Sequence, residues 1–145
     1  MRLTFVVATL AVAISGCGAD PKESFESHVQ MMEKSLAEAS KDSPNITISP
    51  VTYDVTNTDS EVAPYRGTMA VKIISNRPDI EGTGGISTIY GFNFREGAWQ
   101  PGSVKPELIG YGDQVSDATA ISKAADQLFL ENSGIRLHTL NNITN

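Results

Sequence analysis

Apolar side chains in residues 21–41 recur at alternating spacings of four and three residues, which is the pattern of one face of an amphipathic helix. Asp20 is a suitable N-cap, Pro21 suits the first helical position and Glu23 is placed to act as a capping-box partner. The sequence Ser43-Pro44-Asn45 marks the end of this helix. The apolar positions are Phe25, Val29, Met32, Leu36 and Ala39.

From residue 46 the apolar positions alternate with polar ones, which is typical of strands with one buried face. The alternation runs over residues 46–48, and beyond Ser49-Pro50 it resumes in the opposite parity over residues 51–55. A proline beside a change of parity predicts a β-bulge or an edge strand. Asn57-Thr58-Asp59-Ser60 then indicates a turn.

Two longer alternating segments follow, at residues 65–73 and 86–94, with a glycine-rich loop between them at residues 76–85. Glu96-Gly97 predicts a tight turn into a short fourth strand around Trp99. Glycines and prolines between residues 101 and 112 indicate a loop there. The sheet is therefore expected to be a four-stranded antiparallel meander.

A second helix is expected to begin at Ser116-Asp117 and to end at Asn132-Ser133-Gly134. We expect residues 135–145 to form a weakly ordered tail. The apolar face of the helix comprises Ile121, Ala124, Ala125, Leu128 and Phe129.

The predicted fold class is α+β, with the N-terminal helix packed on the four-stranded meander and a C-terminal helix added. The whole chain has 145 residues, which suits one domain, here residues 21–134. Folds of the cystatin or nuclear-transport-factor type are a loose analogy, and an analogy of fold does not carry function.

The first 16 residues have the organisation of a secretory signal peptide. Arg2 is the only charge, and the segment Leu3 to Ile14 is apolar except for Thr4 and Thr9. This stretch is shorter than the roughly 20 apolar residues that span a bilayer. Small residues, Ser15-Gly16, precede Cys17, which is the one cysteine of the chain.

The sequence Ile14-Ser15-Gly16-Cys17 resembles the lipobox of bacterial lipoproteins. That resemblance implies a diacylglycerol thioether at Cys17, cleavage before Cys17 and acylation of the new N-terminus, with chains such as palmitate. Residues 17–20 would then be the lipidated anchor and a short linker. In enteric bacteria an aspartate directly after the lipidated cysteine favours retention in the inner membrane. Here that position is Gly18, which favours the outer membrane. The alternative is an ordinary secretory leader followed by a free cysteine.

Charge and cysteine content exclude several classes of function. The net charge is −6, and removal of Arg2 with the leader makes it one unit more negative. An acidic chain without a basic, aromatic-rich run is unsuited to bind nucleic acid. A single cysteine excludes an intrachain disulfide and a zinc site built on cysteines.

Each candidate polar site also has a simpler structural interpretation, in which it has no function in binding or catalysis. His28 and His138 stand alone and favour neither a zinc site nor a catalytic dyad. Asp79 and Glu81 beside the Gly82–Gly85 run suggest a cation or phosphate cradle, but the loop lies between two strands and has no lysine, so we interpret it as a flexible connection. Three further acidic residues, expected to be solvated at a turn, are Asp54, Asp59 and Glu61.

The aromatic side chains are the candidate ligand-binding residues, because they can line a pocket between helix and sheet. Their alternation is more simply explained as a core. The binding candidates are Tyr65, Tyr90, Phe92 and Trp99.

Residues 53–67 and 90–99, with a Thr-Asp-Ser…Pro-Tyr turn and a strand ending in Gly-x-Trp, resemble uncharacterised small lipoproteins of planctomycete-type bacteria. This resemblance implies no activity.

No catalytic residue, metal or cofactor is predicted. The leading hypothesis is a non-catalytic envelope module, held to membrane lipid through Cys17, that binds an envelope protein or a small apolar ligand. The alternatives are a structural envelope protein without a ligand and a small hydrolase-like enzyme.

Overall fold

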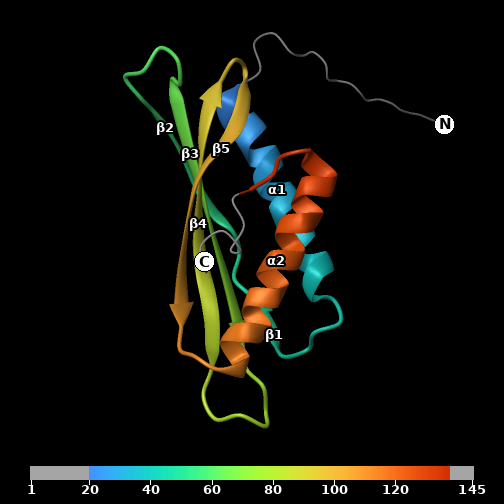
Figure 1. Ribbon diagram of the computed structural model, residues 1–145. Helices are drawn as coiled ribbons and strands as arrows, with labels where there is room; N and C mark the ends of the chain where they lie inside the picture. The colour runs from blue at the N-terminus through green and yellow to red at the C-terminus, as the bar shows by residue number, and fades with distance from the viewer. Residues whose placement is uncertain (1–19, 138–145) are drawn as a thin grey trace, which may run out of the picture.

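The computed structural model describes residues 20–137 and confirms the α+β fold class (Figure 1). The leader, Cys17 and His138 lie outside the described residues. The elements in chain order are α1 (Pro21–Ser40), β1 (Ile46–Ile48), β2 (Thr52–Asn57), β3 (Tyr65–Ser75), β4 (Gly84–Arg95), β5 (Ala98–Ile109) and α2 (Asp113–Ser133).

The first helix, α1, begins where the sequence predicts. The side chain of Asp20 accepts a hydrogen bond of 3.0 Å from the backbone N–H of Lys22, and Pro21 occupies the first turn, where it needs no hydrogen-bond partner. The predicted apolar stripe is the face that the helix buries, through Phe25, Val29, Met32 and Leu36.

One edge of the antiparallel sheet is a strand in two pieces, because β1 and β2 both pair with β3. Ile48 pairs with Ile73 and Thr52 pairs with Ala70, so the register breaks between them. The backbone N–H of Ser49 still donates to the carbonyl of Lys72 at 3.1 Å. The prediction of an irregular edge at the proline is therefore confirmed.

The prediction of a loop over residues 101–112 is wrong for residues 101–109, because β5 continues to Ile109 along β4, and it holds for residues 110–112. Its prolines, Pro101 and Pro106, are tolerated because β5 is the other edge strand, where a missing N–H leaves no partner unsatisfied. The register shifts by one residue opposite Gly91 and Phe92, so that Gly102 forms a bulge.

The second helix starts at Asp113, earlier than the predicted Ser116-Asp117. Gly110 and Gly112 both adopt positive φ, which turns the chain out of β5 and lets the helix start at once. At its other end, Gly134 takes the predicted left-handed C-cap conformation. The tail prediction is wrong for residues 135–137, because Leu137 is buried and Ile135 packs against the core.

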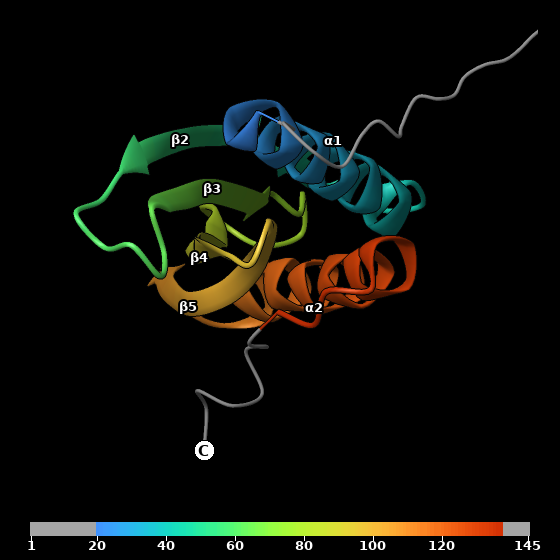
Figure 2. The ribbon, with the colours of Figure 1, turned by 90° about the horizontal axis from the view of Figure 1, so that it is seen from above.

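The two helices lie side by side on one face of the sheet and run in opposite directions (Figure 2). At one end, here called the proximal end, the first turn of α1 lies beside the β4–β5 turn (Figure 1). At the other, distal end, the α1–β1 loop and the β3–β4 loop meet the first turns of α2.

Candidate functional site

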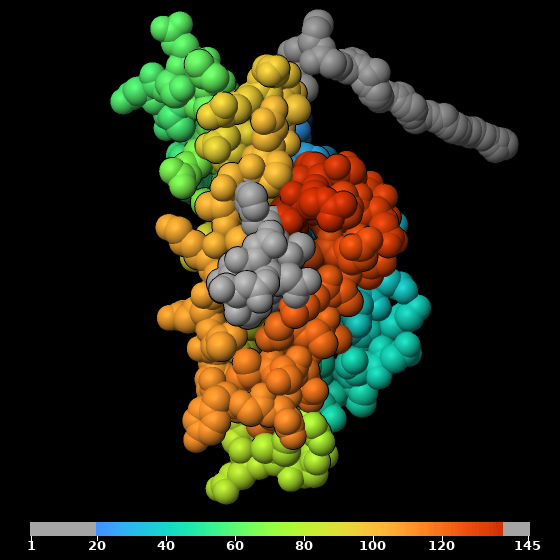
Figure 3. All heavy atoms as spheres, viewed as in Figure 1, coloured from blue at the N-terminus to red at the C-terminus, as the bar shows by residue number. Residues whose placement is uncertain are grey.

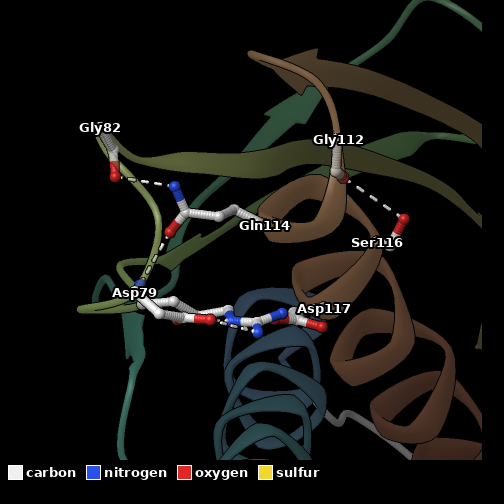
Figure 4. Close-up of polar contacts among 7 residues, drawn as sticks. Asp79, Gly82, Gly112, Gln114, Ser116 and Asp117 are labelled. Atoms are coloured by element: carbon white, nitrogen blue, oxygen red, sulfur yellow. Dashed lines mark hydrogen bonds and ion pairs between the residues drawn. The ribbon is translucent and has the colours of Figure 1, made fainter.

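The β3–β4 loop at the distal end is tied to α2 through the buried side chain of Gln114 (Figure 4). Its Oε1 accepts from the backbone N–H of Arg77 at 2.8 Å, and its Nε2 donates to the carbonyl of Gly82 at 2.7 Å. The oxygen and the nitrogen of the Gln114 side-chain amide therefore both make hydrogen bonds to the β3–β4 loop. The sequence-based interpretation of this loop as a flexible connection did not include these two hydrogen bonds to Gln114.

The guanidinium of Arg77 is held between two carboxylates. Its Nε and Nη2 donate to the two oxygens of Asp79 at 3.1 and 2.8 Å. Its Nη1 lies 3.6 Å from Oδ2 of Asp117, which makes an ion pair but not a hydrogen bond. The bonds from Arg77 lower the pKa of Asp79 below its usual value, and Asp79 raises the pKa of Arg77.

A pocket of about 340 Å³ opens beside this ion pair. In Figure 3 the three segments around it, the α1–β1 loop, the β3–β4 loop and the start of α2, meet at the lower end of the molecule. We call it the Arg77 pocket; its lining comprises Ser43, Pro44, Asn45, Ile46, Ser75, Arg77, Asp117, Ala120 and Ile121.

The lining includes one buried polar atom that lacks a partner among the described residues. Ser75 is fully buried at the end of β3, between Ile46 of β1 and Gly84 of β4. Its Oγ makes no hydrogen bond to any residue that the structure describes. A buried hydroxyl without a partner costs about 1–3 kcal/mol, so a polar group of a ligand that reached it would recover part of that free energy.

The predicted aromatic binding residues do not line this pocket, and three of the four are core residues. Tyr90, Phe92 and Trp99 are at most 3% exposed, and Tyr65 is half-buried. The ring of Phe25 on α1 lies 4.8 Å from that of Trp99, so the helix fills the space that a ligand would need. For Tyr90, Phe92 and Trp99 the structure therefore supports the interpretation as a core.

The other predicted polar positions lie apart from the pocket. His28 lies at the edge of the helix interface, its ring 6.4 Å from that of Phe129, and burial lowers its pKa. The β2–β3 turn is set by local hydrogen bonds of Thr58 and Ser60, and its carboxylates, Asp59 and Glu61, are exposed.

Sequence reasoning missed a buried carboxyl, Asp126, on α2. Its Oδ1 accepts from the hydroxyl of Tyr90 at 2.8 Å, and its Oδ2 has no partner within the described chain. Burial raises its pKa to about 6. The available signal was an aspartate one residue after Ala125 and three before Phe129, within the apolar face of the helix.

Two searches for other kinds of site give no candidate within residues 20–137. No group of three or more His, Cys, Asp or Glu residues is arranged there to hold a metal ion. Among the helices of the same segment, none is long and apolar enough to cross a membrane.

Comparisons with protein-family models, with curated proteins and with solved structures find no match for the chain. The case for function therefore depends on the residues and on their geometry.

Proposed function

We propose that this chain is a bacterial envelope lipoprotein, anchored through Cys17, whose folded domain is a non-catalytic binding module with the Arg77 pocket as its ligand site. The observation that carries the binding proposal is the unpartnered, fully buried hydroxyl of Ser75 in the lining of a pocket.

The anchor in this proposal would hold the proximal end of the domain close to the membrane. Four residue steps separate Cys17 from Pro21, and an extended chain spans at most about 14 Å over that length. The 20 residues of α1 then extend about 30 Å toward the distal end. A domain held in this way keeps the Arg77 pocket away from the lipid and open to the surrounding space.

The chemistry of the pocket supports binding rather than catalysis. A nucleophilic serine needs a base within hydrogen-bond distance, and the hydroxyl of Ser75 has no partner in the described part of the chain. Asp79 raises the pKa of Arg77 and Arg77 lowers the pKa of Asp79, so neither group of this hydrogen-bonded pair is poised as a general acid or base.

A structural envelope protein without a ligand is the second candidate. The observation in its favour is the filled core, in which Trp99 and Phe92 pack directly on Phe25. The two candidates differ in whether the Arg77 pocket is occupied in the cell.

Occupancy can be tested on the mature protein purified in mild detergent from its own envelope. Ala120→Trp would fill the pocket from the exposed face of α2, and Ala124→Trp, one turn along the same helix and outside the lining, is the matched control. We expect mass spectrometry of the extracted small molecules to find a species with the wild type and Ala124→Trp that Ala120→Trp lacks. Identical extracts from all three proteins would favour the structural alternative.

A further inference from the structure

The wall of the Arg77 pocket offers one donor and one acceptor side by side. The donor is Nη1 of Arg77, which makes no hydrogen bond to the described residues, whereas Nε and one N–H of Nη2 are bonded to Asp79. The acceptor is Oδ2 of Asp117, 3.6 Å from that nitrogen. Both residues line the pocket, and their separation is longer than a hydrogen bond, so each keeps bonding capacity.

The charges around this pair disfavour a ligand with a net charge. An anion that accepts from Arg77 would lie beside Asp117 and near Asp79, and a cation that pairs with Asp117 would lie against the guanidinium. The matching ligand group is uncharged and carries an acceptor next to a donor.

A primary carboxamide has this arrangement, because its oxygen and the N–H on the same side of the C–N bond point in the same direction. The oxygen would accept from Nη1 of Arg77 and the adjacent N–H would donate to Asp117. A trans secondary amide lacks an N–H on that side.

The rest of the lining suits a small apolar body attached to that head. Pro44, Ile46, Ala120 and Ile121 supply apolar walls, and about 340 Å³ is the volume of a small-molecule site. The side chains of Ser43, Asn45 and the buried Ser75 add polar groups to the same lining.

The geometry points to a small, uncharged ligand with a primary carboxamide head on an apolar body; this rests on the Arg77 pocket being the ligand site. Asp117 and Arg77 recognise the head, and Ile46 and Ile121 contact the body.

The test uses four compounds of similar shape and the mature lipidated protein in detergent micelles, followed by backbone amide NMR. Isovaleramide carries the proposed head, isovalerate replaces it with an anion and isopentylamine with a cation. N-methylisovaleramide puts a methyl group where the N–H beside the oxygen was. We expect isovaleramide to shift the resonances of Arg77 and Asp117, and the other three to bind about tenfold more weakly, the effect of one lost hydrogen bond.

Two pairs of variants test whether isovaleramide binds in the Arg77 pocket and contacts Asp117. Ala120→Trp should abolish the isovaleramide shifts and Ala124→Trp should keep them. Asp117→Asn should remove the preference for isovaleramide over its N-methyl derivative, whereas Asp113→Asn, on the same helix but outside the lining, should retain it. Equal or stronger binding of a charged compound in the pocket would overturn the carboxamide inference and leave the binding proposal standing. The absence of any shift with isovaleramide would also overturn the inference, and the extraction experiment would still decide the proposed function.

Discussion

The indole Nε1 of Trp99 donates a hydrogen bond to the backbone carbonyl of Pro21, 2.9 Å away, and so ties the β4–β5 hairpin to the first turn of α1. The two residues are far apart in the sequence. Their contact fixes the start of the folded domain against its core, and the proposed lipid anchor would attach a few residues before it.

Trp99→Ala should lower the free energy of unfolding by about 3–5 kcal/mol, because it removes a buried aromatic side chain that packs on Phe25 and Phe94. Trp99→Phe should cost less, since it keeps a ring in the core and loses the hydrogen bond to Pro21. Urea denaturation followed by circular dichroism measures both. A loss in Trp99→Ala no larger than that of a surface substitution would show that this packing is absent.

Ser75→Ala should raise the free energy of unfolding of the ligand-free protein by about 1 kcal/mol, because it removes a buried hydroxyl without a partner. Ser35→Ala is the control: Ser35 is equally buried, but its hydroxyl donates to the carbonyl of Met31 at 2.8 Å. We expect no gain from the control. Denaturation curves in which both variants lose stability would mean that Ser75 has a partner in solution.

Asp126 should make the domain more stable in mild acid. Its folded pKa of about 6 exceeds the ordinary value of 3.8, so the folded state binds the proton more tightly. Its favourable contribution is complete below about pH 4 and is lost as the pH rises through about 6. The difference over this range is roughly 3 kcal/mol by linkage.

Asp126→Asn removes this titration while keeping an oxygen for the hydroxyl of Tyr90. The variant should be more stable than the wild type at about pH 8, and the two should converge near pH 4. His28, whose lowered pKa gives the opposite pH dependence, is present in both proteins and cancels in the difference. Parallel stability curves for the two proteins would refute a raised pKa at Asp126.

The helices and the two long central alternations were predictable because each depends on neighbours in the sequence. The stripe of Phe25, Val29 and Met32 needs only the helical period, and β3 and β4 bury every second residue as predicted. The length of β5 was not predictable from its own residues. Its prolines oppose a strand, and pairing with the long β4 overrides that local preference.

The Arg77 pocket was beyond sequence reasoning because its parts come from distant segments. Arg77 follows β3 and Asp117 lies on α2, and neither belongs to a recognisable motif. The alternation of the aromatic residues fitted either a pocket or a core, with the core favoured, and the packing of Phe25 on Trp99 supports the core.

The mass of the mature N-terminus shows whether Cys17 carries the proposed lipid anchor. The protein should be purified from the membrane fraction of cells fed labelled palmitate, beside a Cys17→Ser variant. We predict a wild-type chain that begins at Cys17, carries the mass of its acyl groups and retains the label, and a variant that stays unprocessed and unlabelled. A wild-type chain with a free thiol at Cys17, or equal labelling of the variant, would contradict the lipoprotein assignment.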